Sequence, residues 1–140
     1  MSSLREPAMA AAKESLQAMW PARRVERGLY DPAVVGDEAL LQGMFCLVAE
    51  GTSGWTDYTG REGEYGTLKF AVVGYIKVDD DALPVVLEQA EAQMEAELLA
   101  WCQAIKAAPI DAVYPRDVTY SRGLELPLGW IVMAMEAQYV

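Results

Sequence analysis

The sequence contains no histidine and only two cysteines among its 140 residues. The absence of histidine excludes the Ser-His-Asp and Cys-His nucleophile systems as ordinarily built, histidine-based acid–base catalysis, and nearly all zinc and non-haem iron sites. The two cysteines, Cys46 and Cys102, lie far apart and outside any CxxC motif, and two thiols cannot build a disulfide framework. We expect both to be buried apolar residues of a protein that works in a reducing compartment.

Positive charge and long apolar runs are also scarce. Eleven basic residues stand against 21 acidic residues, which gives a net charge of −10. A surface of this sign repels phosphate and argues against broad, sequence-specific binding of nucleic acid, although DNA can still pass by such a protein. The longest apolar runs, such as Phe70–Ile76, fall far short of the ~20 residues that span a bilayer. The chain is nevertheless 53% hydrophobic, so we expect residues 1–140 to form one folded domain.

The spacing of apolar residues predicts two helices. The first spans Leu4–Met19, where apolar residues recur every three or four positions and Pro21 stops the helix. The second spans Leu83–Ala107, is capped by Asp80 or Asp81 and ends before Pro109. Its predicted buried face contains Leu87, Ala90, Met94, Leu98, Trp101 and Ile105. Its predicted solvated face contains Glu88, Glu91, Glu95 and Gln103.

Strands are predicted on both sides of the second helix. Gly43–Glu50 and Leu68–Val78 precede it and are expected to pair antiparallel, and Val118–Tyr120 and Trp130–Val140 follow it. Residues 22–39 are irregular, with a short strand or an anchored loop at Leu29, Tyr30, Val34 and Val35. The order of elements predicts an α+β fold. An antiparallel or mixed sheet of about four strands is covered on one face by the N-terminal helix and the long central helix.

No group of residues forms a catalytic, metal or phosphate site. Glu88, Glu91 and Glu95 share a helical face that looks exposed, whereas a catalytic carboxylate pair needs an apolar pocket. Asp79–Asp81 lacks the alternating spacing of a calcium loop. Gly60–Gly66 lacks the phosphate-loop pattern, and its carboxylates would repel phosphate. We therefore expect a protein that is not an enzyme and binds no cofactor or metal.

Two groups of residues are candidates for contacts with other proteins. Arg23, Arg24 and Arg27 form a basic cluster that we expect to pair with carboxylates, within the chain or across a subunit boundary. Arg116 and Arg122 flank a strand and either pair in the same way or are solvated. The connection Gly51–Thr67 combines glycines and charges with aromatic residues, like the anchors and rim of an interface. Its candidate contact residues are Trp55, Tyr58, Arg61 and Tyr65, which alternatively fold back onto their own sheet.

The order of these elements resembles the tail terminator (minor tail) proteins of long-tailed bacteriophages. The elements that carry the resemblance are the helix Leu4–Met19, the arginine-containing arm Arg23–Arg27, the strands Gly43–Glu50 and Leu68–Val78, the acidic helix Leu83–Ala107 and the strand Trp130–Val140. The resemblance covers nearly the whole chain and is one of pattern, because the family has no sharp motif. The connection Gly51–Thr67 is longer than the family pattern.

The resemblance implies a structural virion protein at the head–tail junction, assembled in the host cytoplasm. Such proteins form a hexameric ring that caps the tail tube, stops its polymerisation and offers a joining surface to the neck or head-completion protein. Genomic DNA passes through the ring without sequence-specific binding. No membrane is involved, and an acidic lumen would let the DNA slide.

In a ring, opposite charges on the two edges of a subunit would attract neighbouring subunits to each other. Such heterologous contacts between identical subunits can close into a cycle. Under this hypothesis the cluster Arg23, Arg24 and Arg27 meets the acidic surface of the next subunit. That surface contains Glu88, Glu91 and Glu95, while the loop Gly51–Thr67 contacts tube or neck. Two other functions remain open: a head-completion or neck connector of the same particle, and a small cytosolic dimeric binding module.

Overall fold

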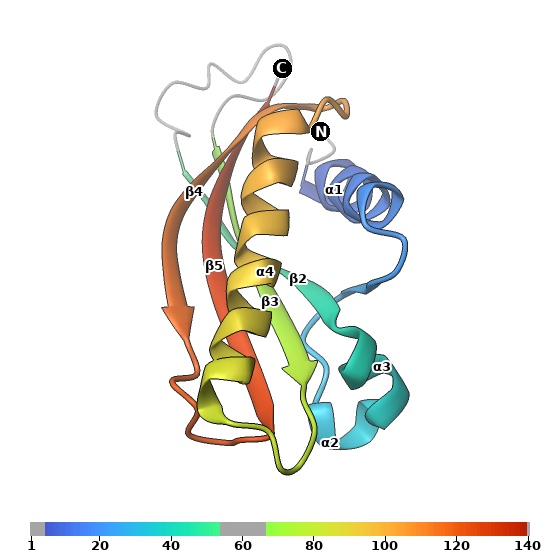
Figure 1. The fold of residues 1–140 in the computed structure, drawn as a ribbon. Helices are drawn as coiled ribbons and strands as arrows, with labels where there is room; N and C mark the ends of the chain where they lie inside the picture. The colour runs from blue at the N-terminus through green and yellow to red at the C-terminus, as the bar shows by residue number, and fades with distance from the viewer. Residues whose placement is uncertain (1–4, 54–66, 140) are drawn as a thin grey trace, which may run out of the picture.

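A five-stranded mixed sheet organises the part of the chain that this computed structural model describes, residues 5–53 and 67–139 (Figure 1). The strands are β1 (Arg24–Arg27), β2 (Met44–Ser53), β3 (Thr67–Lys77), β4 (Ile110–Tyr120) and β5 (Leu128–Tyr139). Their spatial order is β1-β2-β3-β5-β4. Strand β1 runs parallel to β2, and all other neighbours are antiparallel. The predicted α+β fold is confirmed.

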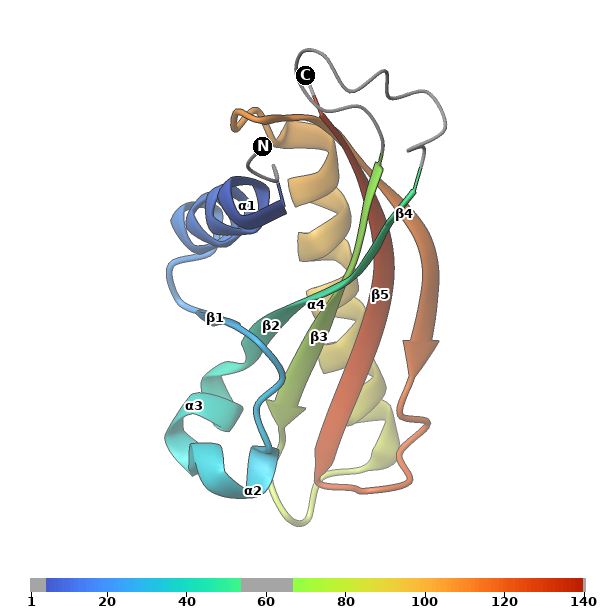
Figure 2. The same ribbon diagram turned by 180° about the vertical axis from the view of Figure 1, so that it is seen from behind.

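Four helices accompany the sheet in the described residues: α1 (Arg5–Met19), α2 (Pro32–Val35), α3 (Asp37–Gln42) and α4 (Pro84–Ala104). The long helices α1 and α4 cover the same face of the sheet, as predicted (Figures 1 and 2). The short helix α3 packs on the opposite face, where Leu40 joins Cys46 and Val73 in a smaller cluster. In the described residues, no helix is long and apolar enough to cross a membrane.

The main core lies between α1, α4 and the inner face of the sheet. Phe70 of β3 meets Trp101 of α4 edge to face, with ring centroids 6.4 Å apart. Trp101 Nε1 also donates to Ser15 Oγ at 3.1 Å, which fixes α4 against α1. The predicted inward residues of α4 pack in this core, with Ala90 only half-buried. Cys46 and Cys102 are buried free cysteines, as expected.

The start of α4 differs from the prediction. Leu83 occupies the N-cap position with an extended backbone, and it makes no side-chain capping bond. Pro84 is the first helical residue, and proline forces the residue before it out of the helical region. The predicted cap by Asp80 or Asp81 is therefore wrong.

Residues 22–39 hold the fifth strand at a position that the sequence does not predict. Strand β1 lies at Arg24–Arg27, before the predicted position at Leu29 and Tyr30, and Val25 is its only buried residue. One apolar residue gives no alternation to detect. Asp31 Oδ1 then accepts from the backbone N–H of Ala33 at 2.9 Å and caps α2.

Strand β4 is longer than predicted. It covers Ile110–Tyr120, whereas apolar patterning predicts only Val118–Tyr120. Two register shifts, at Ile110/Ala112 and Pro115/Asp117, interrupt the alternation in its first half. Proline is tolerated there because β4 is an edge strand.

Candidate functional site

Arg23, the first residue of the predicted basic cluster, pairs with Glu97 of α4. Arg23 Nε lies 2.9 Å from Glu97 Oε1, and Arg23 Nη2 lies 2.7 Å from Glu97 Oε2. The two side chains are only 13% and 7% exposed. Burial alone would raise the pKa of the Glu97 carboxyl, but hydrogen bonds from Arg23 and Gln93 outweigh it and hold that pKa below its usual value. Arg23 therefore has a carboxylate partner within its own chain.

The other two arginines of the cluster also have partners within the chain. Arg24 Nε lies 3.2 Å from Glu26 Oε1, and the Arg24 guanidinium stacks 5.7 Å from the centre of the Tyr30 ring. Arg27 donates to both carboxylate oxygens of Glu6. Hydrogen bonds from Arg27 hold the pKa of Glu6 below its usual value. Both pairs are more exposed than the pair of Arg23 with Glu97.

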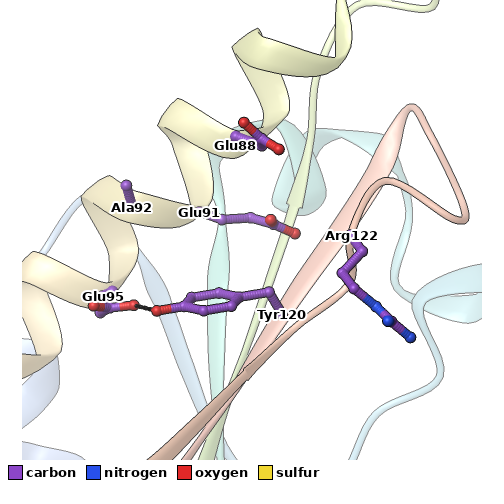
Figure 3. Close-up of a pocket in the computed structure, with 6 residues that line it drawn as sticks. All are labelled: Glu88, Glu91, Ala92, Glu95, Tyr120 and Arg122. Atoms are coloured by element: carbon purple, nitrogen blue, oxygen red, sulfur yellow. Dashed lines mark hydrogen bonds between the residues drawn. The ribbon is translucent and has the colours of Figure 1, made fainter.

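The acidic residues singled out in the sequence line a cleft of about 330 Å³ between α4 and the end of β4 (Figure 3). Four residues of α4 form one wall: Glu88, Glu91, Ala92 and Glu95. Tyr120, which ends β4, and Arg122, in the turn that follows, form the other wall. The structure thus brings the three predicted glutamates together at one edge of the sheet. We call this the acidic cleft.

Glu91 does not lie on a solvated face, which corrects the prediction. It is only 3% exposed and accepts a hydrogen bond from the hydroxyl of the buried Ser121. Gly129 of β5 makes room for it, since a Cβ at that position would lie 2.6 Å from Glu91 Oε2. Helical spacing alone could not show this, because the partner hydroxyl lies 30 residues further along the chain.

The carboxylates of the acidic cleft form hydrogen bonds but no ion pair with a described residue. Glu95 accepts from the hydroxyl of Tyr120, and this hydrogen bond raises the pKa of Tyr120. Figure 3 shows the Arg122 side chain extending away from the carboxylates. Among the described residues, no ion pair joins a lysine or arginine to Glu88, Glu91 or Glu95. No three acidic or cysteine side chains in the described ranges converge as a metal site either.

A groove with basic residues lies at the opposite edge of the sheet. It runs beside α1 and β1, and we call it the α1 groove. Lys13 and Arg27 line it, together with Ala10, Glu14, Gln17 and Ala18. Arg27 pairs with Glu6, but Lys13 forms no ion pair with any residue in the described ranges. The sequence does not single out Lys13, because one lysine on a helix is an ordinary surface residue.

Three segments at one end of the molecule each contain an exposed aliphatic residue. Val34 of α2 is 81% exposed, Leu83 before α4 is 67% exposed, and Leu124 in the turn between β4 and β5 is 76% exposed. Their three segments share the lower end in both views (Figures 1 and 2). Leu29 is exposed as well, so Leu29 and Val34 do not anchor a strand or loop as predicted. We call this region the aliphatic end.

Arg116 forms an ion pair within the chain, whereas no ion pair of Arg122 is found among the described residues. Arg116 Nη2 lies 3.0 Å from Glu136 Oε2, and the guanidinium stacks on Tyr114. Arg122 is exposed and adopts a left-handed backbone with φ of 59°. The predicted contact residues Trp55, Tyr58, Arg61 and Tyr65 lie outside the described residues.

Comparison with known proteins gives a likeness of fold. No protein-family model matches the sequence, and no curated protein matches it. Among solved structures, a chain from the virion of a native gene transfer agent particle is similar with a TM-score of 0.55 and 14% sequence identity. The likeness covers 93% of this chain and 92% of that chain. The two proteins therefore share one fold over nearly their whole lengths.

Proposed function

We propose that this chain is a structural protein of a phage-like virion and, within the particle, the tail terminator. Six copies form a ring at the end of the tail that faces the head. The ring caps the tail tube, stops its polymerisation and offers the surface to which the neck joins. Genomic DNA passes through the lumen. In this role the protein acts by shape and self-association, with no covalent bond made or broken.

The observation that carries the proposal is the extent of the fold similarity. The likeness to a virion chain covers more than nine-tenths of both proteins, so it concerns whole folds and not a common substructure. The same element order underlies the resemblance to tail terminators that the sequence suggests. The similar chain is part of a virion, and this supports placing the present chain in a virion as well.

The charge and surface of the chain suit this role. Six copies of a chain with net charge −10 would carry about −60, and negative walls let DNA slide without sticking. The exposed side chains Val34, Leu83 and Leu124 of the aliphatic end are candidates for contact with another protein, and we assign them to the tail tube or the neck.

A head-completion or neck connector of the same particle is the second candidate, because such proteins share the small size of this 140-residue chain and the ring symmetry proposed for it. Co-purification separates the two. A terminator stays with tails made in the absence of heads, whereas a connector stays with heads made in the absence of tails. A compact dimer near 31 kDa, twice the 15.4 kDa of one chain, under every assembly condition would contradict both and favour a dimeric binding module.

A further inference from the structure

The acidic cleft and the α1 groove lie at opposite edges of one sheet. Strands β1 and β4 are its outermost strands. Helix α1 lies beside β1, and the acidic cleft is formed where α4 meets β4 (Figures 1 and 2). No cation of the α1 groove can therefore reach the cleft within the same chain. Arg122 is the one cation among the residues that line the cleft, and its side chain extends away from the three carboxylates, so the cleft keeps an excess of negative charge.

The two edges carry opposite charge. Residues 79–104 contain seven acidic residues and no basic residue. Among the described residues, only one of these seven, Glu97, has a basic partner. Residues 5–27 contain five basic and three acidic residues, a net charge of +2. Arg23, Arg24 and Arg27 are already paired with Glu97, Glu26 and Glu6. The positive charge that the α1 groove offers to another molecule is therefore that of Lys13, which lies beside Glu14.

We propose that the α1 groove of one copy docks against the acidic cleft of the next copy, with Lys13 entering the cleft near Glu88 and Glu95. This inference rests on the proposed ring and names the surfaces that close it. The occupant is a second copy because the complementary charge is present on this same chain. Tyr120, which is exposed and lines the cleft, supplies apolar contact around the ion pair.

The arrangement of the two surfaces also selects the type of assembly. In a two-fold dimer one patch meets its own copy, so the α1 groove and the acidic cleft could pair only if both lay within that single patch. Unlike surfaces on opposite edges join head to tail, and such a contact closes into a ring when the rotation permits. Arg23 is not the central cation, because it is committed to Glu97 within its own chain. Lys13 takes the place that the sequence gives to the arginine cluster.

A charge swap tests the pairing. Glu88 is exposed and Lys13 is half-buried, and neither forms an ion pair with a described residue. We therefore expect both variants to fold, and circular dichroism checks this before assembly is measured. We expect Lys13→Glu alone and Glu88→Lys alone each to weaken ring assembly roughly tenfold or more, and the double variant to recover it. The matched controls are Lys106→Glu and Glu38→Lys, which reverse exposed charges that line neither surface and should assemble like the wild type. Single variants that assemble normally, controls that fail equally, or a double variant that does not recover would each overturn the pairing.

Zero-length crosslinking between amines and carboxyls separates this inference from the proposed function. In a mixture of isotopically light and heavy chains, peptide mass spectrometry should find Lys13 joined to Glu88 or Glu95 between copies. A chain that yields this crosslink but never closes a six-membered ring supports the interface and contradicts the terminator role. Hexamers without the crosslink support the ring and overturn the interface.

Discussion

Arg23 and Glu97 lie 74 residues apart in the sequence and form a bidentate ion pair that joins the start of β1 to α4. Arg23 Nη1 also donates to the carbonyl oxygen of Gln42 at 2.7 Å, next to the start of β2. The pair therefore fixes the short edge strand and the connection before β2 against the long helix. A buried pair of this kind is costly to break by removing one partner, because the other charge is left without compensation.

Replacing Glu97 by glutamine removes the charge and leaves Arg23 buried without its carboxylate. We expect Glu97→Gln to lower the free energy of unfolding by about 3 kcal/mol. Urea denaturation monitored by circular dichroism measures this change in the free energy of unfolding. The control is Glu14→Gln on α1, an exposed residue whose substitution should leave the midpoint unchanged. Equal stability of Glu97→Gln and wild type would show that the pair contributes nothing.

The ion pair of Arg23 with Glu97 also predicts that the free energy of unfolding depends on pH. The folded-state pKa of Glu97 is lowered, so its stabilisation is present above the unfolded pKa of glutamate, near 4.3, and is lost as the pH falls through the folded pKa. The difference in unfolding free energy between wild type and Glu97→Gln should therefore be constant from about pH 7 to 5 and shrink below about pH 4. A difference that grows on acidification would contradict the direction of the shift.

Gly129 is the residue that lets Glu91 and Leu87 approach β5. An added Cβ would lie 2.5 Å from Leu87 Cδ1 and 2.6 Å from Glu91 Oε2. We expect Gly129→Ala to lower the melting temperature and to destabilise the fold by about 1–3 kcal/mol, the usual range for overpacking. Gly51→Ala is the matched control, because a Cβ at Gly51 meets nothing within 4 Å. If both variants melt together, α4 and β5 are not in close contact at this point.

The aliphatic end is assigned to the tube or the neck, which predicts variants that fold but fail to dock. Val34→Asp and Leu124→Asp place charges on side chains that are 81% and 76% exposed, so stability should change little. We expect the double variant to form rings normally but to sediment with headless tails at a small fraction of the wild-type level. Wild-type levels in the tail fraction would remove the aliphatic end from the docking surface.

The sequence predicts most of the fold because the signals of the larger elements are local. Helices α1 and α4 and strands β2, β3 and β5 follow from apolar spacing over ten or more residues. Strand β1 is missed because it has only four residues, and most of β4 is missed because bulges and Pro115 break its alternation. Both are edge strands, where one neighbour and exposure to solvent relax the pattern.

The candidate site is less predictable because its partners are distant in the sequence. Charge alone brings Arg23 and the acidic helix to attention, but only the folded chain shows that Arg23 pairs with Glu97, a residue that the sequence does not single out. Glu91 turns inward because Ser121 and Gly129 are brought beneath it by β4 and β5. Lys13 becomes a candidate for the proposed docking only because it lies in the α1 groove, at the edge opposite the acidic cleft.

Native mass spectrometry, on the free protein and on the protein bound to tail tubes made without heads, tests the central claim most directly. Six copies of the 15.4 kDa chain give a ring of about 92 kDa, and we predict this mass either in solution or after release from the tubes. A chain that stays monomeric or dimeric in both samples, and that does not bind the tubes, would contradict the terminator role.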